Sequence, residues 1–400
     1  MIDLDVLKKR YGNEMALAIL VLRVFLGQET SAGVNLYLRE NDIDWNLFAS
    51  IIKLHKLRPV VLKVFGANKS DLPVSFLNEL RTASLQIATG NLCNLEELVK
   101  IHSLFKSRGI PAVVYKGVIL SKQLYGDYVS RETSDIDFLV EPQQFSGAHD
   151  LLVANGYKPR YYNPDFESHI LASSHEILYR KVTAKGPIKI EIHWAATSKM
   201  LHVPVPNSYL LQGGTALNLL GTDITVFSPD RHFLVLLIHH GVNDVWCSLR
   251  HVLDISSFVL RYSNEINWEE FKEATKKFGL FNTTVVGFCL ARDLFGTEIP
   301  EVFRGDCVIT TTVYNNLLEY PGIGKGKFSI GNLQQQLYLR DSLRNKIELI
   351  ASYAKAGITP NIRDMEAYHL PKKWYPLYYL IKPYRFCKSR SKKSTSDFLK

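Results

Sequence analysis

The stretch Asp135-Ile-Asp-Phe-Leu-Val140 decides how this 400-residue chain is expected to fold. Apart from its two aspartates it is apolar, and Glu141-Pro142 ends it, which is typical of a strand. Side chains two residues apart on a strand point to the same face, so Asp135 and Asp137 are expected side by side. Two adjacent carboxylates repel each other unless a cation neutralises them. The stretch therefore predicts a strand that carries a cation site.

The ligand atoms of Asp135 and Asp137 suit Mg²⁺ (or Mn²⁺), because hard cations bind carboxylate oxygens together with substrate phosphates. A metal-free interpretation stays open, in which one aspartate caps the beginning of the strand and the other faces solvent. A third carboxylate favours the metal. Glu191 lies in Ile188-Lys-Ile-Glu-Ile-His-Trp194, where isoleucines alternate with polar residues as on a half-buried strand.

If this second strand neighbours the first, Glu191 completes a three-carboxylate, two-metal cluster for in-line displacement at phosphorus. In the alternative, Glu191 belongs to an exposed polar stripe. His193 shares the face of Glu191, so we expect it to contact substrate or to orient Glu191. His175 is a further candidate for a substrate contact, with a structural role as its alternative.

Lys116-Gly117 lies between a short β-rich run, residues 111–115, and a helical segment. A glycine at such a junction lets backbone N–H groups approach a phosphate, and the beginning of a helix favours anions. We therefore expect Lys116 and Gly117 to bind nucleotide. Arg131, four residues before Asp135, is placed to reach a triphosphate, although a lone arginine is often part of a surface ion pair.

Further polar residues lie on helices predicted after residue 228. His239, His240 and His251 have no metal-ligand partners at useful spacing, so packing roles are expected for them. Arg250 and Asp254 are four residues apart and are expected to pair on one helix, or to line a cleft between domains.

Periodicity divides the chain into four parts. Residues 1–110 repeat apolar positions at spacings of three and four, which predicts helices, and residues 111–200 alternate short strands with helices. Residues 201–370 return to a mainly helical pattern, and residues 371–400 form an aromatic and basic tail, partly disordered. The predicted fold is α+β, with a small mixed β-sheet core flanked by helical N- and C-terminal regions.

The net charge of +9 is concentrated in the tail. From Lys372 onward nine basic residues oppose the single acidic Asp397, so eight of the nine net charges lie there. The aromatic and basic residues suit a contact with an anionic membrane or with RNA, or the aromatic segment packs on the body. No run of about 18 apolar residues predicts a transmembrane helix, and acidic Asp3 and Asp5 are unlike a secretory signal, so we expect a cytoplasmic protein.

The ordered set of these motifs resembles a bacterial family of uncharacterised nucleotidyltransferases in the polymerase-β superfamily. The motifs are, in chain order, Tyr115-Lys-Gly-Val-Ile-Leu120, Leu124-Tyr125, Arg131, Asp135-Ile-Asp-Phe-Leu-Val140, Asn155-Gly-Tyr157 and Glu191-Ile-His-Trp194. The resemblance implies that Asp135, Asp137 and Glu191 bind metal and act in catalysis, and that Lys116 and Gly117 form the loop on the nucleotide side. Gly117 is followed by Val118, where the wider superfamily usually has serine or a second glycine.

The expected function is metal-dependent transfer of a nucleoside monophosphate from an NTP, with ATP as the expected donor, and release of pyrophosphate. The acceptor is unidentified and is expected to be a small molecule, a peptide or a protein rather than RNA. Two alternatives stay open. A metal-dependent glycosyltransferase also uses an Asp-x-Asp pair, and a non-catalytic nucleotide-binding or assembly module would keep the binding residues.

Overall fold

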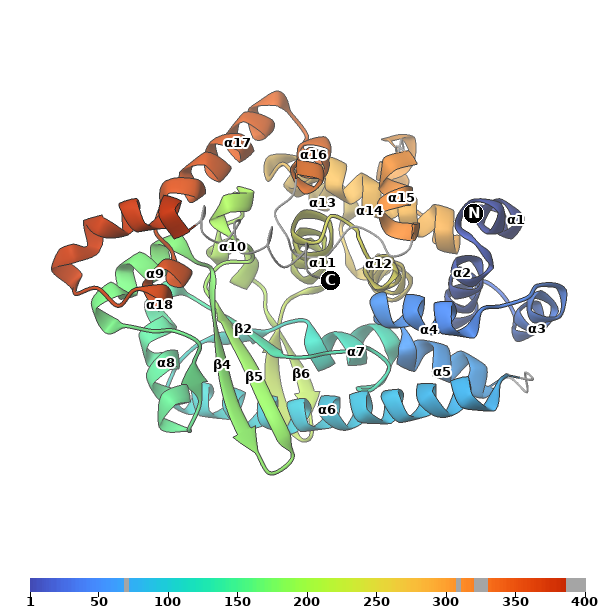
Figure 1. Ribbon diagram of the computed structural model, residues 1–400, viewed down its shortest axis with the longest axis horizontal. Helices are drawn as coiled ribbons and strands as arrows, with labels where there is room; N and C mark the ends of the chain where they lie inside the picture. The colour runs from blue at the N-terminus through green and yellow to red at the C-terminus, as the bar shows by residue number, and fades with distance from the viewer. Residues whose placement is uncertain (68–71, 307–310, 320–329, 386–400) are drawn as a thin grey trace, which may run out of the picture.

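The computed structural model describes residues 1–67, 72–306, 311–319 and 330–385 (Figure 1). The described residues form an α+β fold around a seven-stranded mixed sheet, in the strand order β3-β4-β5-β2-β1-β7-β6. The strands are β1 (Ala112–Val114), β2 (Ile136–Val140), β3 (Lys158–Pro159), β4 (Glu176–Thr183), β5 (Gly186–His193), β6 (Thr215–Leu219) and β7 (Thr222–Val226).

The helices divide into three groups along the chain. The N-terminal group is α1 (Leu4–Tyr11), α2 (Asn13–Phe25), α3 (Ser31–Glu40), α4 (Trp45–Leu54), α5 (Arg58–Ala67) and α6 (Val74–Ser107). Among and after the first strands lie α7 (Gly117–Tyr125), α8 (Phe145–Ala154), α9 (Glu167–Ser173) and α10 (Asn207–Leu211). The C-terminal group is α11 (Pro229–Leu237), α12 (Leu249–Tyr262), α13 (Trp268–Lys277), α14 (Phe281–Phe295), α15 (Thr311–Leu318), α16 (Ile330–Tyr338), α17 (Leu343–Ile358) and α18 (Ile362–Ala367).

The two faces of the sheet have different neighbours, as the alternation along β2 and β5 predicts. Ile136, Phe138 and Val140 of β2 belong to one hydrophobic core with residues of α6 and α8, and Phe105 of α6 packs edge-on against Phe138 at 5.2 Å between ring centroids. Leu139 points to the opposite face and joins a second core with residues of the N- and C-terminal helices. Asp137 shares the face of Leu139, so its carboxylate lies between the sheet and the C-terminal group of helices, which we call the C-terminal layer.

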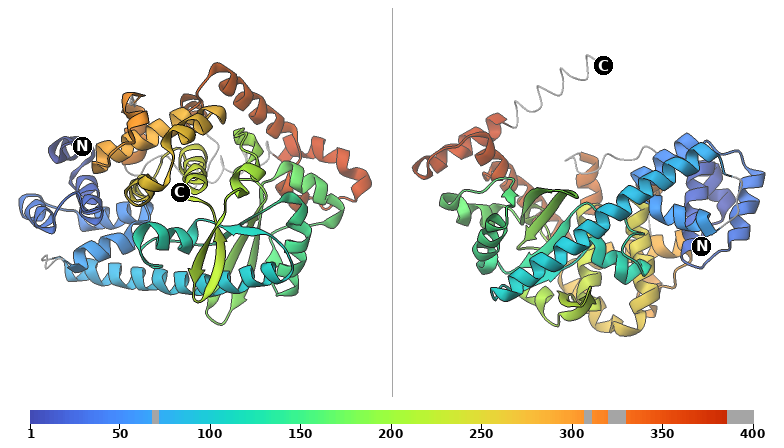
Figure 2. Two further views of the ribbon diagram at one scale, coloured as in Figure 1. Left: turned by 180° about the vertical axis from the view of Figure 1, so that it is seen from behind. Right: turned by 90° about the horizontal axis from the view of Figure 1, so that it is seen from below.

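Helix α6 joins the N-terminal helices to the sheet in one continuous element of 34 residues (Figure 2). Its first turns pack on α4 and α5 through Phe76 and Leu80, and its last turns pack under the strands through Ile101 and Phe105. Asn91, in the middle, is buried. Its side-chain amide donates to the carbonyls of residues 128 and 131 at 2.9 and 2.8 Å, so α6 also fixes the loop that leads into β2.

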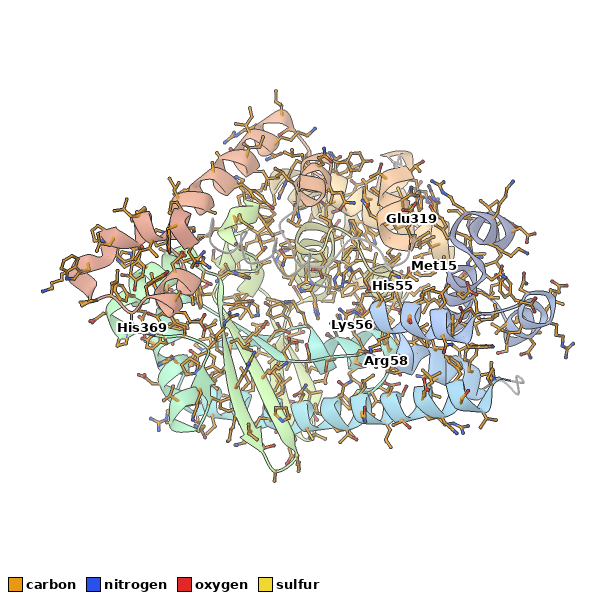
Figure 3. The ribbon with its side chains drawn as sticks, viewed as in Figure 1. Met15, His55, Lys56, Arg58, Glu319 and His369 are labelled. Carbon is orange, nitrogen blue, oxygen red and sulfur yellow. The ribbon has the colours of Figure 1, made fainter. Side chains whose placement is uncertain are left out.

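The turn between α4 and α5 joins the N-terminal helices to the loop before β2 and to the C-terminal helices (Figure 3). Arg58 forms a bidentate ion pair with Glu132, with nitrogen–oxygen distances of 3.0 and 2.7 Å, in the loop before β2. The Nδ1 atom of His55 accepts the backbone N–H of Leu249, the first residue of α12, at 3.1 Å. Lys56, between them, has a positive φ of 56°, which the tight turn requires.

The sheet extends beyond the segment expected to contain it. The hairpin β6–β7 falls within residues 201–370, for which a mainly helical pattern is expected, yet β7 pairs in parallel with β1 through Val114 and Val226. Its outer strand β6 is largely exposed, so its apolar pattern is weak. The four domain ranges themselves stay a prediction.

The aromatic segment near the C-terminus packs on the body in part. Tyr378 is fully buried, and Tyr375 stacks on His169 of α9 with ring centroids 3.8 Å apart, whereas Trp374 is half exposed. Residues 386–400, which carry most of the predicted basic tail, lie outside the described residues. Among the described residues, no helix has both the length and the apolar character needed to cross a bilayer.

Two helical glycines in different surroundings test the packing of the C-terminal layer. A Cβ atom at Gly287 of α14 would lie 2.6 Å from the Cη2 atom of buried Trp246, whereas a Cβ atom at Gly90 of α6 would meet nothing within 4 Å. We expect Gly287→Ala to lower the free energy of unfolding by about 1–3 kcal/mol despite the better helix propensity of alanine. Gly90→Ala, the control, is expected to raise it by up to about 1 kcal/mol. Urea denaturation measures both, and a stabilised Gly287→Ala would contradict the packing described here.

Candidate active site

The site begins with the pairing of β2 and β5. These strands are parallel neighbours, and Asp137 is the Cα partner of Glu191. Because paired residues on adjacent strands point to the same face, their carboxylates lie side by side. One oxygen of each, together with a ring nitrogen of His193, lies within a group of atoms no more than 4.8 Å apart. Asp137 is 3% exposed, so its charge needs partners from the protein or from a ligand.

His193 supplies one of these partners. Its Nε2 atom lies 3.1 Å from Asp137 Oδ1 and 3.4 Å from Glu191 Oε2. Burial disfavours the charged ring, but the hydrogen bonds to Asp137 and Glu191 and the nearby charge of Glu176 raise the pKa of His193 to about 9. The ring is therefore an imidazolium near neutral pH, and it holds both carboxylates in place.

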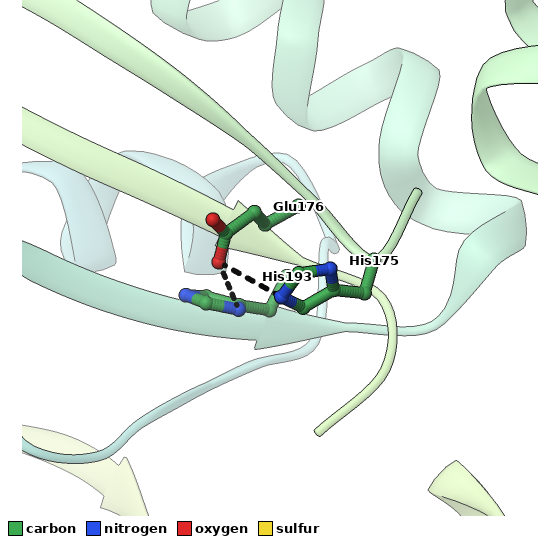
Figure 4. Close-up of side chains that lie close together, drawn as sticks. All are labelled: His175, Glu176 and His193. Atoms are coloured by element: carbon green, nitrogen blue, oxygen red, sulfur yellow. Dashed lines mark ion pairs between the residues drawn. The ribbon is translucent and has the colours of Figure 1, made fainter. Parts of the chain in front are cut away.

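Glu176, the first residue of β4, is a site residue that the sequence reasoning missed. Its Oε2 atom lies 3.2 Å from His193 Nδ1 and 3.3 Å from His175 Nε2 (Figure 4). Burial raises the pKa of Glu176, and burial and the charges of His193 and Lys116 lower the pKa of His175 to about 3. The alternating hairpin sequence contained the signal, since counting back from its turn places Glu176 of β4 opposite His193 of β5.

Lys116 and Gly117 lie at the beginning of α7, close to Asp137 of β2. The Lys116 ammonium is 3.4 Å from Asp137 Oδ1. Both residues have positive φ, 67° and 51°, and a Cβ atom at Gly117 would lie 3.1 Å from the carbonyl oxygen of Asp135. Glycine is thus required at this close approach. Lysine is strained in such a conformation, and backbone strain of this kind is concentrated at functional sites.

Asp135 precedes β2 by one residue and accepts a 2.9 Å hydrogen bond from the Ser134 hydroxyl. Burial, followed by the charges of Asp137 and Glu191, raises the pKa of Asp135. The three predicted carboxylates therefore share one electrostatic neighbourhood rich in negative charge. Asp137 and Glu191 belong to the group of ligand atoms within 4.8 Å of one another, and Asp135 does not. These two carboxylates fit a divalent cation, which would also reduce the repulsion that adds to the effect of burial on the pKa of Asp135.

Arg131 lies elsewhere, in a buried ion pair with Asp254 of α12. Its Nη2 atom is 2.9 Å from Asp254 Oδ2, and Asp254 also accepts the Tyr125 hydroxyl at 2.7 Å. Arg131 and His240 hold the pKa of Asp254 well below its usual range despite burial. The expected pairing of Arg250 with Asp254 is wrong, because Arg131 is the partner and Arg250 donates instead to the carbonyl of Glu132 at 2.9 Å.

A family model described as uncharacterised nucleotidyltransferase matches residues 41–296. The chain belongs to this nucleotidyltransferase family. The match covers more than half of the chain and includes every site residue named above, so the protein is a nucleotidyltransferase enzyme. No curated protein matches the chain. The roles of the individual residues in this nucleotidyltransferase stay predictions.

The buried pair between Arg131 and Asp254 is expected to be costly to break. Arg131→Met should lower the free energy of unfolding by about 3–5 kcal/mol, because it leaves a buried carboxylate without its main counter-charge. Lys185→Met is the matched control, since Lys185 is 61% exposed and pairs with exposed Glu96. That change should cost far less stability, because an exposed ion pair contributes little. Equal losses in urea denaturation would show that Arg131 does not hold the layers together.

His193 gives the metal-free nucleotidyltransferase a specific pH dependence. Its pKa rises from an ordinary value near 6.5 to about 9 in the folded protein, so its charge contributes stability in full below pH 6.5. This contribution disappears as the pH rises through about 9. In the presence of EDTA, His193→Gln should therefore cost more stability at pH 6.5 than at pH 9.5. A loss that is the same at both pH values in thermal unfolding would contradict the imidazolium.

Proposed function

We propose that this nucleotidyltransferase moves a nucleoside monophosphate from an NTP, with ATP as donor, to a hydroxyl of its acceptor in a reaction that requires Mg²⁺ or Mn²⁺. One observation carries the proposal. Asp137 and Glu191 are register partners on parallel strands, and the Lys116-Gly117 turn lies directly beside them. A cation site of hard oxygen ligands thus adjoins an anion site of backbone N–H groups and an ammonium.

The triphosphate side of the site is assigned to Lys116 and to the beginning of α7. The free N–H groups of the first turn and the Lys116 ammonium both attract phosphate oxygens. Lys116 pairs with Asp137 at 3.4 Å, so it can exchange this carboxylate for a phosphate when the nucleotide binds. Gly117 is favoured because its φ is positive and a Cβ atom at this position would lie unusually close, at 3.1 Å, to the carbonyl oxygen of Asp135.

The cation side is assigned to Asp135, Asp137 and Glu191. When bound there, Mg²⁺ neutralises phosphate charge and makes the acceptor hydroxyl more acidic. His193 orients Asp137 and Glu191 through its Nε2 atom, and Glu176 fixes the ring from the other side through Nδ1. These contacts hold the carboxylates in one arrangement before the substrates arrive, which lowers the cost of reorganisation during the reaction.

The transfer is an in-line displacement at the α-phosphorus. The acceptor oxygen forms the new bond, the bond to the leaving pyrophosphate breaks, and the proton of the hydroxyl passes to a carboxylate or to solvent. His175 and His193 lie on the side of the site toward β4, where we assign the acceptor.

The reaction can be tested with the full chain, Mg²⁺, cell extract and each of four α-labelled NTPs. We expect one nucleotide to label an acceptor and to release pyrophosphate. Asp137→Asn and Glu191→Gln should slow labelling on the order of 10³-fold, since several kcal/mol of charge stabilisation are lost and each 1.36 kcal/mol is tenfold. Asp150→Asn is the matched control, an exposed aspartate of α8 that should leave the rate unchanged.

The products and variants separate this proposal from its alternatives. Release of a free nucleoside diphosphate would identify a glycosyltransferase. Mg²⁺-dependent binding of NTP that persists in Asp137→Ala, without labelling by any of the four nucleotides, would identify a binding module. Full labelling activity in Asp137→Asn would remove the carboxylate pair from the mechanism.

A further inference from the structure

A group of metal-ligand atoms outside the candidate active site lies in the C-terminal layer, where the sequence predicts only packing. It is built on a π-helical turn, η4 (Ile238–Asn243), that continues α11. The Nδ1 atoms of His239 and His240 are 3.2 Å apart, and Asp244 Oδ2 is 3.7 Å from His239 Nδ1. All three ligand atoms lie within 4.8 Å of one another.

We propose that His239, His240 and Asp244 form a binding site for a transition-metal ion of the Zn²⁺ class, separate from the carboxylate site of β2 and β5. Ligands at about 2.0–2.1 Å from a tetrahedral ion are about 3.3–3.4 Å from one another, close to the separations found here. Two imidazoles and one carboxylate suit Zn²⁺, whereas Mg²⁺ prefers oxygen ligands alone.

The local backbone explains how neighbouring histidines converge. On a regular α-helix consecutive side chains point about 100° apart, but the wider π turn alters this, and π turns are frequent at functional sites. The next residues are also constrained, since Val245 and Trp246 have positive φ values of 43° and 58°. Buried Trp246 donates its backbone N–H to the carbonyl of His240 at 2.8 Å, so the loop holds Asp244 beside the turn.

Neighbouring side chains orient the ligands in the way that metal sites require. His240 Nε2 is 3.0 Å from buried Asp254, a carboxylate already paired with Arg131. An ionised carboxylate accepts, so Nε2 carries the proton and Nδ1 presents its lone pair toward His239. His251 Nε2 lies 3.2 Å from Asp244 Oδ2 and fixes this carboxylate. A carboxylate behind a ligating histidine is the usual support of a metal site.

Two of the three ligand residues are partly accessible to solvent. The side chain of His240 is 1% exposed, whereas the side chains of His239 and Asp244 are 24% and 37% exposed. Three protein ligands leave a fourth position for water or substrate, as in zinc sites that act on a ligand.

Cobalt binding tests the proposal directly, since Co²⁺ replaces Zn²⁺ and its visible absorption reports tetrahedral coordination. The chelator-treated full chain, with Mg²⁺ in excess, should bind one equivalent of Co²⁺, which Zn²⁺ then displaces. His239→Ala and Asp244→Asn should each weaken Zn²⁺ binding at least about 100-fold, since each removes a ligand. Both side chains are partly exposed, and circular dichroism checks that both variants fold.

Controls separate this site from the active site and from a structural role. Asp137→Asn and His175→Ala should bind Co²⁺ as the unaltered protein does, so the proposal can fail while the transfer reaction stands, and the reverse. His239→Cys should retain the ion and add a thiolate-to-cobalt charge-transfer band in the near ultraviolet. Each of three results would overturn the proposal. These are failure of the unaltered protein to bind Co²⁺, a Co²⁺ spectrum that is unchanged in His239→Ala and Asp244→Asn, and loss of Co²⁺ binding in His175→Ala.

Discussion

The repulsion between two carboxylates on adjacent parallel strands is the constraint on which the rest of the active site depends. The β2–β5 register brings Asp137 against Glu191, and the charge of buried Asp137 needs compensation at this depth. The protein answers with an imidazolium at His193 and an ammonium at Lys116, each within 3.4 Å of Asp137. Glu176 then balances His193 on its far side. Each of these charged side chains therefore compensates the charge of its neighbour.

Asp254 likewise gathers compensating partners, here between the sheet and the C-terminal layer. It gathers Arg131 from the loop before β2, the Tyr125 hydroxyl from α7 and His240 from the π turn, although it is itself fully buried. A single buried carboxylate with three such partners ties the position of the C-terminal layer to those of α7 and the loop before β2. The second candidate cation site is thus joined through Asp254 to the loop before β2 and to α7.

Local patterns in the sequence predicted the fold well where a single strand or helix decides the outcome. Alternation along residues 188–194 and the apolar stretch at Asp135 gave the correct strands and the correct faces, because a period of two fixes both at once. The sequence could not show that β2 and β5 are neighbours, since parallel pairing depends on the crossover between them. The partner of Arg131 was equally out of reach, as Asp254 is 123 residues away. Packing is predicted for His239 and His240 because the sequence offers them no metal-ligand partner at a useful spacing, and nothing in the sequence indicates the π turn.

The uninterrupted course of α6 restricts how this protein can change during evolution. Phe76 and Leu80 face the N-terminal helices at one end, and Ile101 and Phe105 face the strands at the other. Inserting one residue between these ends would rotate one contact surface against the other by about 100° and shift it by about 1.5 Å. Only lengths near whole numbers of turns, such as seven or eleven residues, would restore the phase. Insertions and deletions are therefore expected in the loops of this enzyme. The middle of α6 should keep a constant length, because it sets the distance and the rotation between the two hydrophobic cores of the protein.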